Sequence, residues 1–250
     1  MEEGLVRERD LSVRIFADGA DLDSIARLVE NPRVSGFTTN PTLMRKAGVR
    51  DYRTFAREVL AVVGDRPVSF EVFSDDLEEM ERQAEAIASW GRNVFVKIPI
   101  TNTRGQFVGP LVERLSRRGV QVNVTALTMA GQVADVVGCL AEETASFVSL
   151  FAGRVADTGR DPVPVMAEAV RLLARRPKAQ LIWASSRELL NVFQADAVGC
   201  HVITVTPDLL AKLSLIGKDL LEYSLETVRM FREDAVKAGY SIETAVTHGA

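Results

Sequence analysis

Short apolar runs alternate with amphipathic stretches along almost the whole chain. The apolar runs are rich in Val, Ile and Phe, which is typical of strands buried on both faces. They predict strands at residues 13–17, 34–38, 68–73, 94–100, 120–124, 147–151, 180–184 and 202–205. The stretches between them have the spacing of helices, at residues 21–29, 52–63, 75–90, 107–118, 129–142, 163–175 and 187–195. Helical sequence follows the last strand to about residue 238.

Strands that are each followed by a helix predict a single-domain (β/α)8 TIM barrel. A doubly wound open sheet is the rival, but no Gly-rich phosphate loop follows the first strand. Asp21 stands where an N-cap is expected for the first helix. We expect one domain over residues 1–250, with a short N-terminal extension at residues 1–12 and a C-terminal helix at about 217–238.

Composition and charge limit the classes of partner. The net charge of −4 predicts no basic surface for nucleic acid. No apolar run approaches the roughly 20 residues of a membrane span, so no membrane association is expected. Cys139 and Cys200 lie far apart without ligand spacing, which indicates a reducing compartment. The amino terminus lacks the order of a signal peptide, and a cytoplasmic protein is expected.

One lysine interrupts the fourth apolar run. Lys97 lies between Val96 and Ile98, although taking an ammonium group out of water costs several kcal/mol. Either the side chain reaches solvent past the end of the strand, or the amine is held in a low-dielectric pocket. In such a pocket desolvation favours the neutral, nucleophilic amine, which can attack a carbonyl to form a Schiff base.

A carboxylate interrupts the third apolar run in the same way. Glu71 lies between Phe70 and Val72. Ionisable groups on neighbouring strands can share an active-site interior, or they can form a simple structural ion pair. The sequence leaves both explanations open for Glu71 and Lys97.

Polar residues stand near the carboxyl ends of most predicted strands, where a barrel carries its chemistry. Each alone has a structural explanation: Asp18 as a helix cap, Asn40 in a turn, Thr125 at a solvated strand end. Their coincidence around the barrel favours a catalytic site. The residues are Asp18, Thr38, Asn40, Glu71, Lys97, Asn123, Thr125, Ser149, Arg154, Ser185 and Arg187.

Five segments resemble the signature blocks of the transaldolase family. The resemblance runs in family order from about residue 13 to residue 213. The segments are residues 36–42 (Gly-Phe-Thr-Thr-Asn-Pro-Thr), 96–99 (Val-Lys-Ile-Pro), 123–125 (Asn-Val-Thr), 149–154 (Ser-Leu-Phe-Ala-Gly-Arg) and 184–187 (Ala-Ser-Ser-Arg).

The resemblance implies a class I aldolase mechanism in a (β/α)8 barrel, without a metal or other cofactor. Lys97 would form the Schiff base with the C2 carbonyl of a ketose phosphate. Glu71 would shuttle protons through a water held with Thr125. Asp18 would take the proton from the C4 hydroxyl as the C3–C4 bond breaks.

The resemblance also implies a binding site for sugar phosphates. Asn40, Asn123 and Ser149 would hold the dihydroxyacetone fragment, and Thr38 and Phe151 would complete this part of the site. The phosphate would be bound by Arg154, Ser185 and Arg187, since a planar guanidinium makes bidentate contacts. Neither His201 nor His248 has a partner at metal-ligand spacing. Each is expected to be structural or in a mobile tail, and residues 247–250 to be disordered.

Two positions separate the activities within the superfamily. Fructose-6-phosphate aldolases carry Gln in place of Glu71 and Tyr in place of Phe151, so both residues favour a transaldolase. The resemblance implies a place in the pentose phosphate pathway. The donor would be fructose 6-phosphate or sedoheptulose 7-phosphate. The alternatives are an aldolase that releases free dihydroxyacetone and a catalytically silent sugar-phosphate-binding barrel. A specialised transaldolase of unusual sugar biosynthesis is a further alternative. It is suggested by residues 101–106, which replace the usual Thr-x-x-Gly connection, and by the N-terminal extension.

The C-terminal helix is rich in apolar residues. It packs either on its own barrel or against another subunit. Small family members form pentamers or decamers, so the resemblance implies a homo-oligomer. The apolar residues are Leu220, Leu221, Tyr223, Leu225, Val228, Met230 and Phe231.

Overall fold

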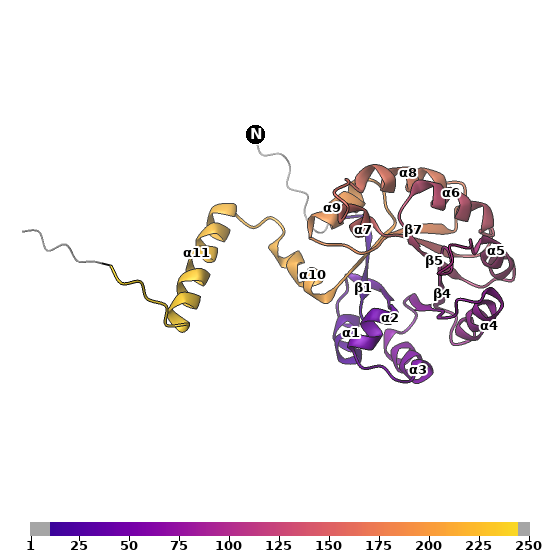
Figure 1. The fold of residues 1–250 in the computed structure, drawn as a ribbon, viewed down its shortest axis with the longest axis horizontal. Helices are drawn as coiled ribbons and strands as arrows, with labels where there is room; N and C mark the ends of the chain where they lie inside the picture. The colour runs from indigo at the N-terminus through magenta and orange to yellow at the C-terminus, as the bar shows by residue number, and fades with distance from the viewer. Residues whose placement is uncertain (1–10, 245–250) are drawn as a thin grey trace, which may run out of the picture.

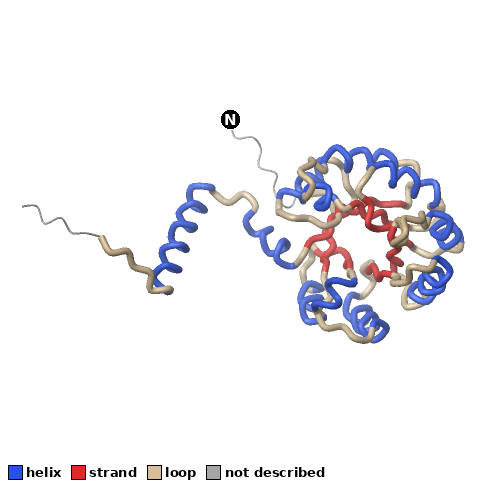
Figure 2. The backbone as a smooth tube through the Cα atoms, viewed as in Figure 1, coloured by secondary structure: helices blue, strands red, loops and turns tan. Residues whose placement is uncertain are grey.

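Eight parallel strands close into one barrel in the computed structural model, which describes residues 11–244 (Figures 1 and 2). Strand order follows the chain, and β1 pairs with β8 to close the ring. The predicted (β/α)8 barrel is therefore confirmed. The strands are β1 (Arg14–Asp18), β2 (Val34–Thr38), β3 (Val68–Glu71), β4 (Val94–Pro99), β5 (Val122–Leu127), β6 (Ser146–Leu150), β7 (Ala179–Trp183) and β8 (Val202–Val205).

Helices surround the barrel on its outer side (Figure 2). As predicted, Asp21 is an N-cap, and its carboxylate accepts a hydrogen bond of 2.8 Å from the backbone N–H of Ser24. The long helices of the wall are α1 (Leu22–Val29), α3 (Tyr52–Val63), α4 (Leu77–Ala88), α5 (Gly109–Arg117), α6 (Ala130–Cys139), α8 (Val163–Leu173) and α9 (Leu190–Ala197). The shorter elements are α2 (Pro41–Lys46), α7 (Ala152–Ala156), α10 (Pro207–Ala211) and the 3-10 helix η2 (Lys212–Leu215).

Aromatic side chains fill the lower part of the barrel interior. The Phe147 ring lies 5.5 Å from that of Phe16 and 4.3 Å from that of Phe95, between centroids. Gly36 makes room for this layer, because a Cβ atom there would lie 2.6 Å from the Phe16 ring. Side chains alternate along a strand, so the inward positions two residues further on point into the upper part of the barrel. Those positions include Asp18, Thr38 and Lys97.

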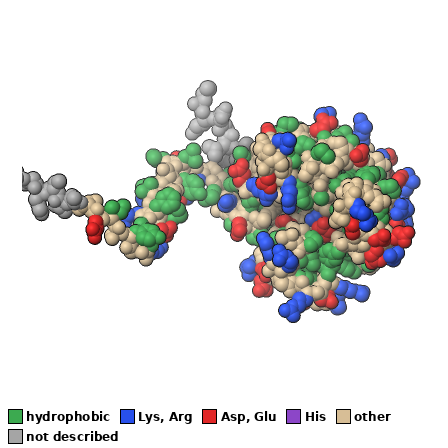
Figure 3. All heavy atoms as spheres, in the orientation of Figure 1, with side chains coloured by type: hydrophobic (Ala, Val, Ile, Leu, Met, Phe, Trp, Pro, Cys, Tyr) green, Lys and Arg blue, Asp and Glu red, His purple; other side chains and the backbone are tan. Residues whose placement is uncertain are grey.

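The last helix, α11 (Leu220–Lys237), stands away from the barrel (Figure 1). None of its residues is buried, and its apolar side chains gather on the projecting arm (Figure 3). Packing of this helix on its own barrel, one of the two arrangements considered above, is not what the structure shows. Within residues 11–244, no helix combines the length and the apolar character needed to cross a membrane. Most of the N-terminal extension, His248 and the tail at 247–250 lie outside the described residues.

Candidate active site

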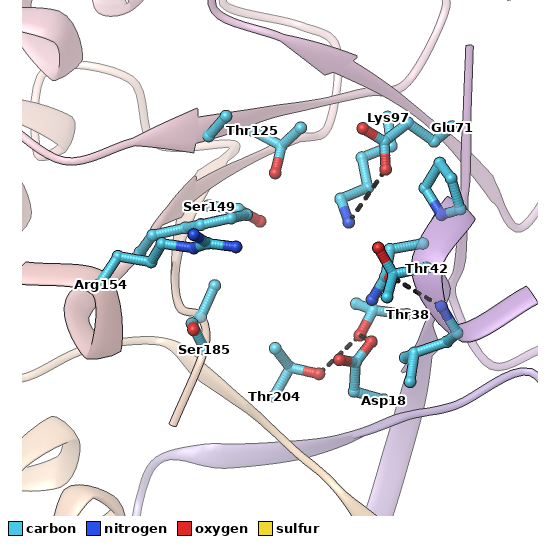
Figure 4. A pocket seen from close by; sticks show the side chains of 16 residues that line it. Asp18, Thr38, Thr42, Glu71, Lys97, Thr125, Ser149, Arg154, Ser185 and Thr204 are labelled. Atoms are coloured by element: carbon cyan, nitrogen blue, oxygen red, sulfur yellow. Dashed lines mark hydrogen bonds and ion pairs between the residues drawn. The ribbon is translucent and has the colours of Figure 1, made fainter. Parts of the chain in front are cut away.

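A cavity of about 390 Å³ opens at the carboxyl ends of the strands. Figure 4 shows side chains from opposite sides of the barrel pointing into it. Of the residues predicted from the sequence, all except Asn123 and Arg187 line this cavity. The described residues that line it are Asp18, Thr38, Asn40, Pro41, Thr42, Leu43, Glu71, Lys97, Thr125, Ala126, Ser149, Phe151, Arg154, Ala184, Ser185 and Thr204.

Lys97 and Glu71 form a pair in the cavity wall. They are Cα partners on β4 and β3, and Nζ of Lys97 lies 3.4 Å from Oε2 of Glu71. Nζ also donates a hydrogen bond of 3.0 Å to the backbone carbonyl of Thr39. Lys97 is only 7% exposed, so of the two arrangements considered for it, the structure has the amine held in a pocket and not the one that reaches bulk solvent. An amine with a carboxylate beside it in a cavity is suited to nucleophilic attack assisted by proton transfer.

Asp18 enters the same cavity from β1. Its Oδ1 accepts a hydrogen bond of 2.8 Å from the Thr38 hydroxyl, which lies 2.6 Å from the Thr204 hydroxyl. Burial raises the pKa of Asp18, while the charge of Lys97 and the Thr38 hydrogen bond act in the opposite direction. Since Asp21 caps the first helix, Asp18 is free to act as an acid or base in the cavity.

Asn40 has two roles at the rim. Its side-chain oxygen accepts a hydrogen bond of 2.9 Å from the Leu43 N–H, and so caps the N-terminus of α2. The residue also lines the cavity. With the oxygen committed to the cap, the amide NH₂ group is the part of the side chain that can bind a ligand.

Asn123 lies below the cavity. It is completely buried, donates from Nδ2 to Oγ of Ser69 at 2.9 Å, and accepts at Oδ1 from the Ser149 hydroxyl at 2.8 Å. These two bonds fix the amide orientation. Asn123 therefore supports Ser149, which lines the cavity above it.

The hydroxyl of Thr125 has no hydrogen-bond partner among residues 11–244. The residue is 1% exposed, and its Oγ1 is buried without a hydrogen bond although it lines the cavity. The structural alternative considered for Thr125 alone, a solvated strand end, therefore does not apply. The next residue, Ala126, has a positive φ of 66°, where the register with β6 shifts. A non-glycine residue in this conformation costs about 1–3 kcal/mol, a strain typical of functional sites.

The far side of the cavity is made by the segments that follow β6 and β7. Arg154 of α7 and Ser185 line it, and Ser185 has a positive φ of 62°. The two segments touch closely, because a Cβ on Gly153 would lie 1.6 Å from the carbonyl oxygen of Ser185. Only glycine permits this approach. It brings Arg154 and Ser185 to one end of the cavity, opposite Lys97 (Figure 4).

Arg187 is held outside the cavity lining. Its Nε donates to Oδ1 of Asp157 at 3.1 Å, and its Nη2 contacts the second carboxylate oxygen. The Arg187 hydrogen bond lowers the pKa of Asp157. Both side chains are about half exposed, at 47% and 52%, so the pair contributes little to stability. To bind a ligand in the cavity, Arg187 would have to move.

Sequence reasoning missed several residues of the site. Thr204 could have been found, since it is a polar residue at an inward position of an apolar strand. Pro41, Thr42 and Leu43 reach the cavity because α2 begins at its rim. Asp157 is different, because it joins Arg187 through a contact between residues 30 positions apart. No periodic pattern indicates such a contact.

His201 lies away from the cavity, and no metal site is formed by the described residues. In the part of the chain that the structure describes, His, Cys, Asp and Glu form no cluster of three or more that could hold a metal ion. Nδ1 of His201 accepts a hydrogen bond of 3.1 Å from the Leu181 N–H, away from the cavity. Burial and the charge of Arg14 lower its pKa.

Comparisons with known proteins give one consistent relationship. The family model described as "Transaldolase/Fructose-6-phosphate aldolase" matches residues 15–247. The chain is 36% identical to a "Probable transaldolase" of Dehalococcoides mccartyi, over 77% of this chain and 86% of that protein. It is 33% identical to a protein of the same name from Thermoanaerobacter sp., over 92% of this chain and all of that protein.

A solved structure from Coccidioides immitis, assigned to the dihydrodipicolinate synthase family, has the same fold. The TM-score is 0.54 at 12% sequence identity, and the match covers 77% of this chain and 66% of that chain.

Proposed function

The chain belongs to the transaldolase/fructose-6-phosphate aldolase family, and from this premise we propose that it is a transaldolase. It transfers a dihydroxyacetone unit from a ketose phosphate to an aldose phosphate. The observation that carries the proposal is the pair of Lys97 and Glu71 in the cavity, 3.4 Å apart. The Thr125 hydroxyl, which bonds to none of the described residues, lines the same space.

The first step joins enzyme and donor. Lys97 passes a proton to Glu71, and the free amine then attacks the C2 carbonyl of the ketose phosphate. Transfer of a proton from nitrogen to oxygen gives a carbinolamine, which loses water to form a protonated iminium. The leaving hydroxyl needs a proton, and Glu71 supplies it through a water that hydrogen-bonds to Thr125. The same carboxylate accepts a proton when the iminium is hydrolysed at the end of the cycle.

The second step breaks the C3–C4 bond. Asp18 takes the proton of the C4 hydroxyl, the bond electrons move into the iminium, and an enamine remains on Lys97 while an aldose phosphate leaves. In the reverse sense, the enamine carbon attacks the aldehyde of the acceptor, and Asp18 returns the proton to the new hydroxyl. The Thr38 hydrogen bond to Asp18 supports this role, because it orients the carboxylate.

The remaining cavity residues bind the substrate. Asn40, Ser149, Thr38 and Phe151 hold the dihydroxyacetone part near Lys97, with Asn123 supporting Ser149 from below. Arg154 and Ser185 bind the phosphate at the opposite end of the cavity, and Arg187 joins them after it leaves Asp157. These sugar phosphates are the proposed partners.

A transfer assay tests this function. With fructose 6-phosphate and erythrose 4-phosphate together, the enzyme should form sedoheptulose 7-phosphate and glyceraldehyde 3-phosphate. With fructose 6-phosphate alone, it should release little dihydroxyacetone, since the enamine waits for an aldehyde acceptor. Steady release of dihydroxyacetone that no aldose phosphate stimulates would instead establish the aldolase alternative. Absence of both transfer and dihydroxyacetone release would support the third alternative, a catalytically silent protein that binds sugar phosphates.

A specialised acceptor is the alternative suggested by residues 101–106. This connection folds against the loop after β3, where the Asp75 carboxylate accepts hydrogen bonds from the Thr103 N–H at 2.6 Å and from its hydroxyl at 2.8 Å. None of its residues is in the cavity lining. We therefore place the pentose phosphate acceptor first, and an aldehyde screen distinguishes the two.

We also propose that the protein is a cytoplasmic homo-oligomer, as its sequence predicts. Support comes from α11, whose large apolar side chains are exposed in the single chain, Leu221 at 81% and Phe231 at 64%. A second copy is the proposed partner of this surface. Sedimentation of the full chain and of a variant with Leu221→Glu and Phe231→Glu tests the assembly. A wild-type monomer would contradict it.

A further inference from the structure

The catalytic strand β3 extends beyond its neighbour β2. The register between these strands pairs Phe37 with Val68 and Thr38 with Ser69, and extends no further. Beyond Thr38 the chain turns away into α2, which begins at Pro41. On its other side β3 stays paired with β4, and the Val72 N–H donates to the Lys97 carbonyl at 3.0 Å.

This arrangement leaves the backbone of Glu71 without a strand partner on one side. In a parallel strand, the N–H and C=O of one residue point toward the same neighbour, and successive residues alternate sides. Ser69 bonds on the β2 side, where its carbonyl accepts from the Thr39 N–H at 3.3 Å. Glu71, two residues later, therefore also points its N–H and C=O toward β2, at a level where β2 has ended.

The hydroxyl of Tyr52 takes the place of the missing strand. It accepts a hydrogen bond of 2.7 Å from the Glu71 N–H and donates one of 3.0 Å to the Glu71 carbonyl. Tyr52 is the first residue of α3, just after the N-cap Asp51. One side chain from the helical wall thus satisfies both backbone groups of the proposed proton shuttle.

Aromatic packing holds the Tyr52 ring in place. Phe70, Phe73 and Trp90 surround it at centroid distances of 6.1, 4.6 and 5.4 Å. Burial raises the pKa of Tyr52, so the phenol keeps the proton that it donates to Glu71. A rigid ring with a fixed hydroxyl is a precise anchor for the end of a strand.

We propose that Tyr52 is a positioning residue, whose hydroxyl fixes the backbone of Glu71 and thereby the distance of its carboxylate from Lys97. The inference rests on the proposed function, in which Glu71 moves protons during imine formation and hydrolysis. A displacement of about 1 Å at a reacting group can lower a rate by about a hundredfold. Loss of the Tyr52 hydroxyl should thus slow turnover. It should not weaken the binding of the sugar phosphate, because other residues bind the substrate.

Tyr52→Phe tests this proposal, because it removes the hydroxyl and keeps the ring. The expected result is a kcat for transfer that falls about tenfold to a hundredfold, with KM for fructose 6-phosphate changed less than about twofold. Phe55→Leu is the matched control. Phe55 lies on the same helix and packs against Phe70 at 6.5 Å, but it makes no bond to Glu71, so stability should fall while kcat stays near the wild-type value.

A double-mutant cycle separates positioning from a general loss of structure. If Tyr52 acts through Glu71, adding Tyr52→Phe to Glu71→Gln should cost less than about twofold in kcat beyond the single Glu71→Gln change. An equal loss in both backgrounds would overturn the proposal, and so would a kcat of Tyr52→Phe that equals the wild type.

Amide hydrogen exchange tests the role of Tyr52 independently of the proposed transaldolase activity. Exchange at the Glu71 amide should be faster in Tyr52→Phe than in Phe55→Leu at equal global stability. Unchanged protection of the Glu71 amide in Tyr52→Phe would contradict the positioning role of Tyr52, even if the enzyme is an active transaldolase. A wild-type protein without transfer activity would defeat the proposed function, and the catalytic part of this inference with it, whatever the exchange shows.

Discussion

Glu71 and Lys97 are direct neighbours across β3 and β4, and the carboxylate oxygen Oε2 lies 3.4 Å from the amine Nζ. Buried pairs of this kind often have a purely structural role. Here the pair borders a cavity that also contains Asp18 and the Thr125 hydroxyl. The position of the pair in this cavity is the reason for assigning it a chemical role.

Glu71→Gln should lower transfer by about 10²- to 10⁴-fold, because an amide cannot pass a proton to and from the water of imine formation. The melting temperature should change little, since Gln keeps the shape of Glu. Transfer rate and melting temperature are measured on the same variant. A large loss of stability with nearly normal turnover would identify a structural ion pair instead.

Asp18→Asn should abolish transfer and change the pH dependence of stability. Burial raises the pKa of Asp18 in the folded state above the ordinary 3.8. At a pH between 3.8 and this raised pKa, the folded state therefore binds more protons than the unfolded state. Protonation of Asp18 therefore adds to the free energy of unfolding. This contribution is complete below pH 3.8 and is lost as the pH rises through the pKa of Asp18 in the folded state. Asn does not titrate, and should remove this decline.

Urea unfolding of wild type and Asp18→Asn across that pH interval tests the prediction. The difference in unfolding free energy should grow in favour of the variant as the pH rises, and the variant should be inactive at every pH. Parallel pH profiles for the two proteins would show that Asp18 titrates normally.

Arg154→Ala should raise KM for fructose 6-phosphate about tenfold to a hundredfold, and should change KM for unphosphorylated dihydroxyacetone far less. A charge-assisted contact to phosphate contributes about 1.5–3 kcal/mol, and Arg154 lines the cavity opposite Lys97. Equal penalties for both donors would show that Arg154 has a structural role.

We expect a different result for Arg187, because Asp157 already binds its guanidinium group. If Arg187 leaves Asp157 to bind phosphate, Arg187→Ala should raise KM for phosphorylated donors and Asp157→Asn should lower it. Steady-state kinetics with phosphorylated and unphosphorylated donors distinguish these effects. Unchanged KM in both variants would place Arg187 outside the phosphate site.

The barrel and most of the site could be predicted because both depend on local pattern. Alternation of apolar runs and amphipathic stretches identifies the strands, and a polar residue at a strand end, such as Lys97, stands out against its apolar neighbours. The short helices α2 and α7 were missed, since five or six residues give too little periodicity. The strand predicted at 68–73 ends at Glu71, although its apolar pattern continues.

Contacts between distant segments could not be predicted in this way. Tyr52 bonds the Glu71 backbone from another element, and it reads in the sequence only as part of an amphipathic helix. The Arg187 and Asp157 pair, and the burial of Asn123 below the cavity, depend equally on tertiary packing. The exposure of α11 has the same cause, because an apolar helix face does not specify the surface that it meets.

Borohydride trapping tests the central claim, the Schiff base on Lys97, most directly. Wild type and Lys97→Met are incubated with fructose 6-phosphate and sodium borohydride, digested, and mapped by mass spectrometry. We expect a reduced covalent adduct on the peptide that contains Lys97 and no adduct in the folded Lys97→Met variant. Turnover of this variant should fall by more than about a thousandfold. Absence of an adduct from the wild type, or an adduct on a different lysine, would contradict the claim.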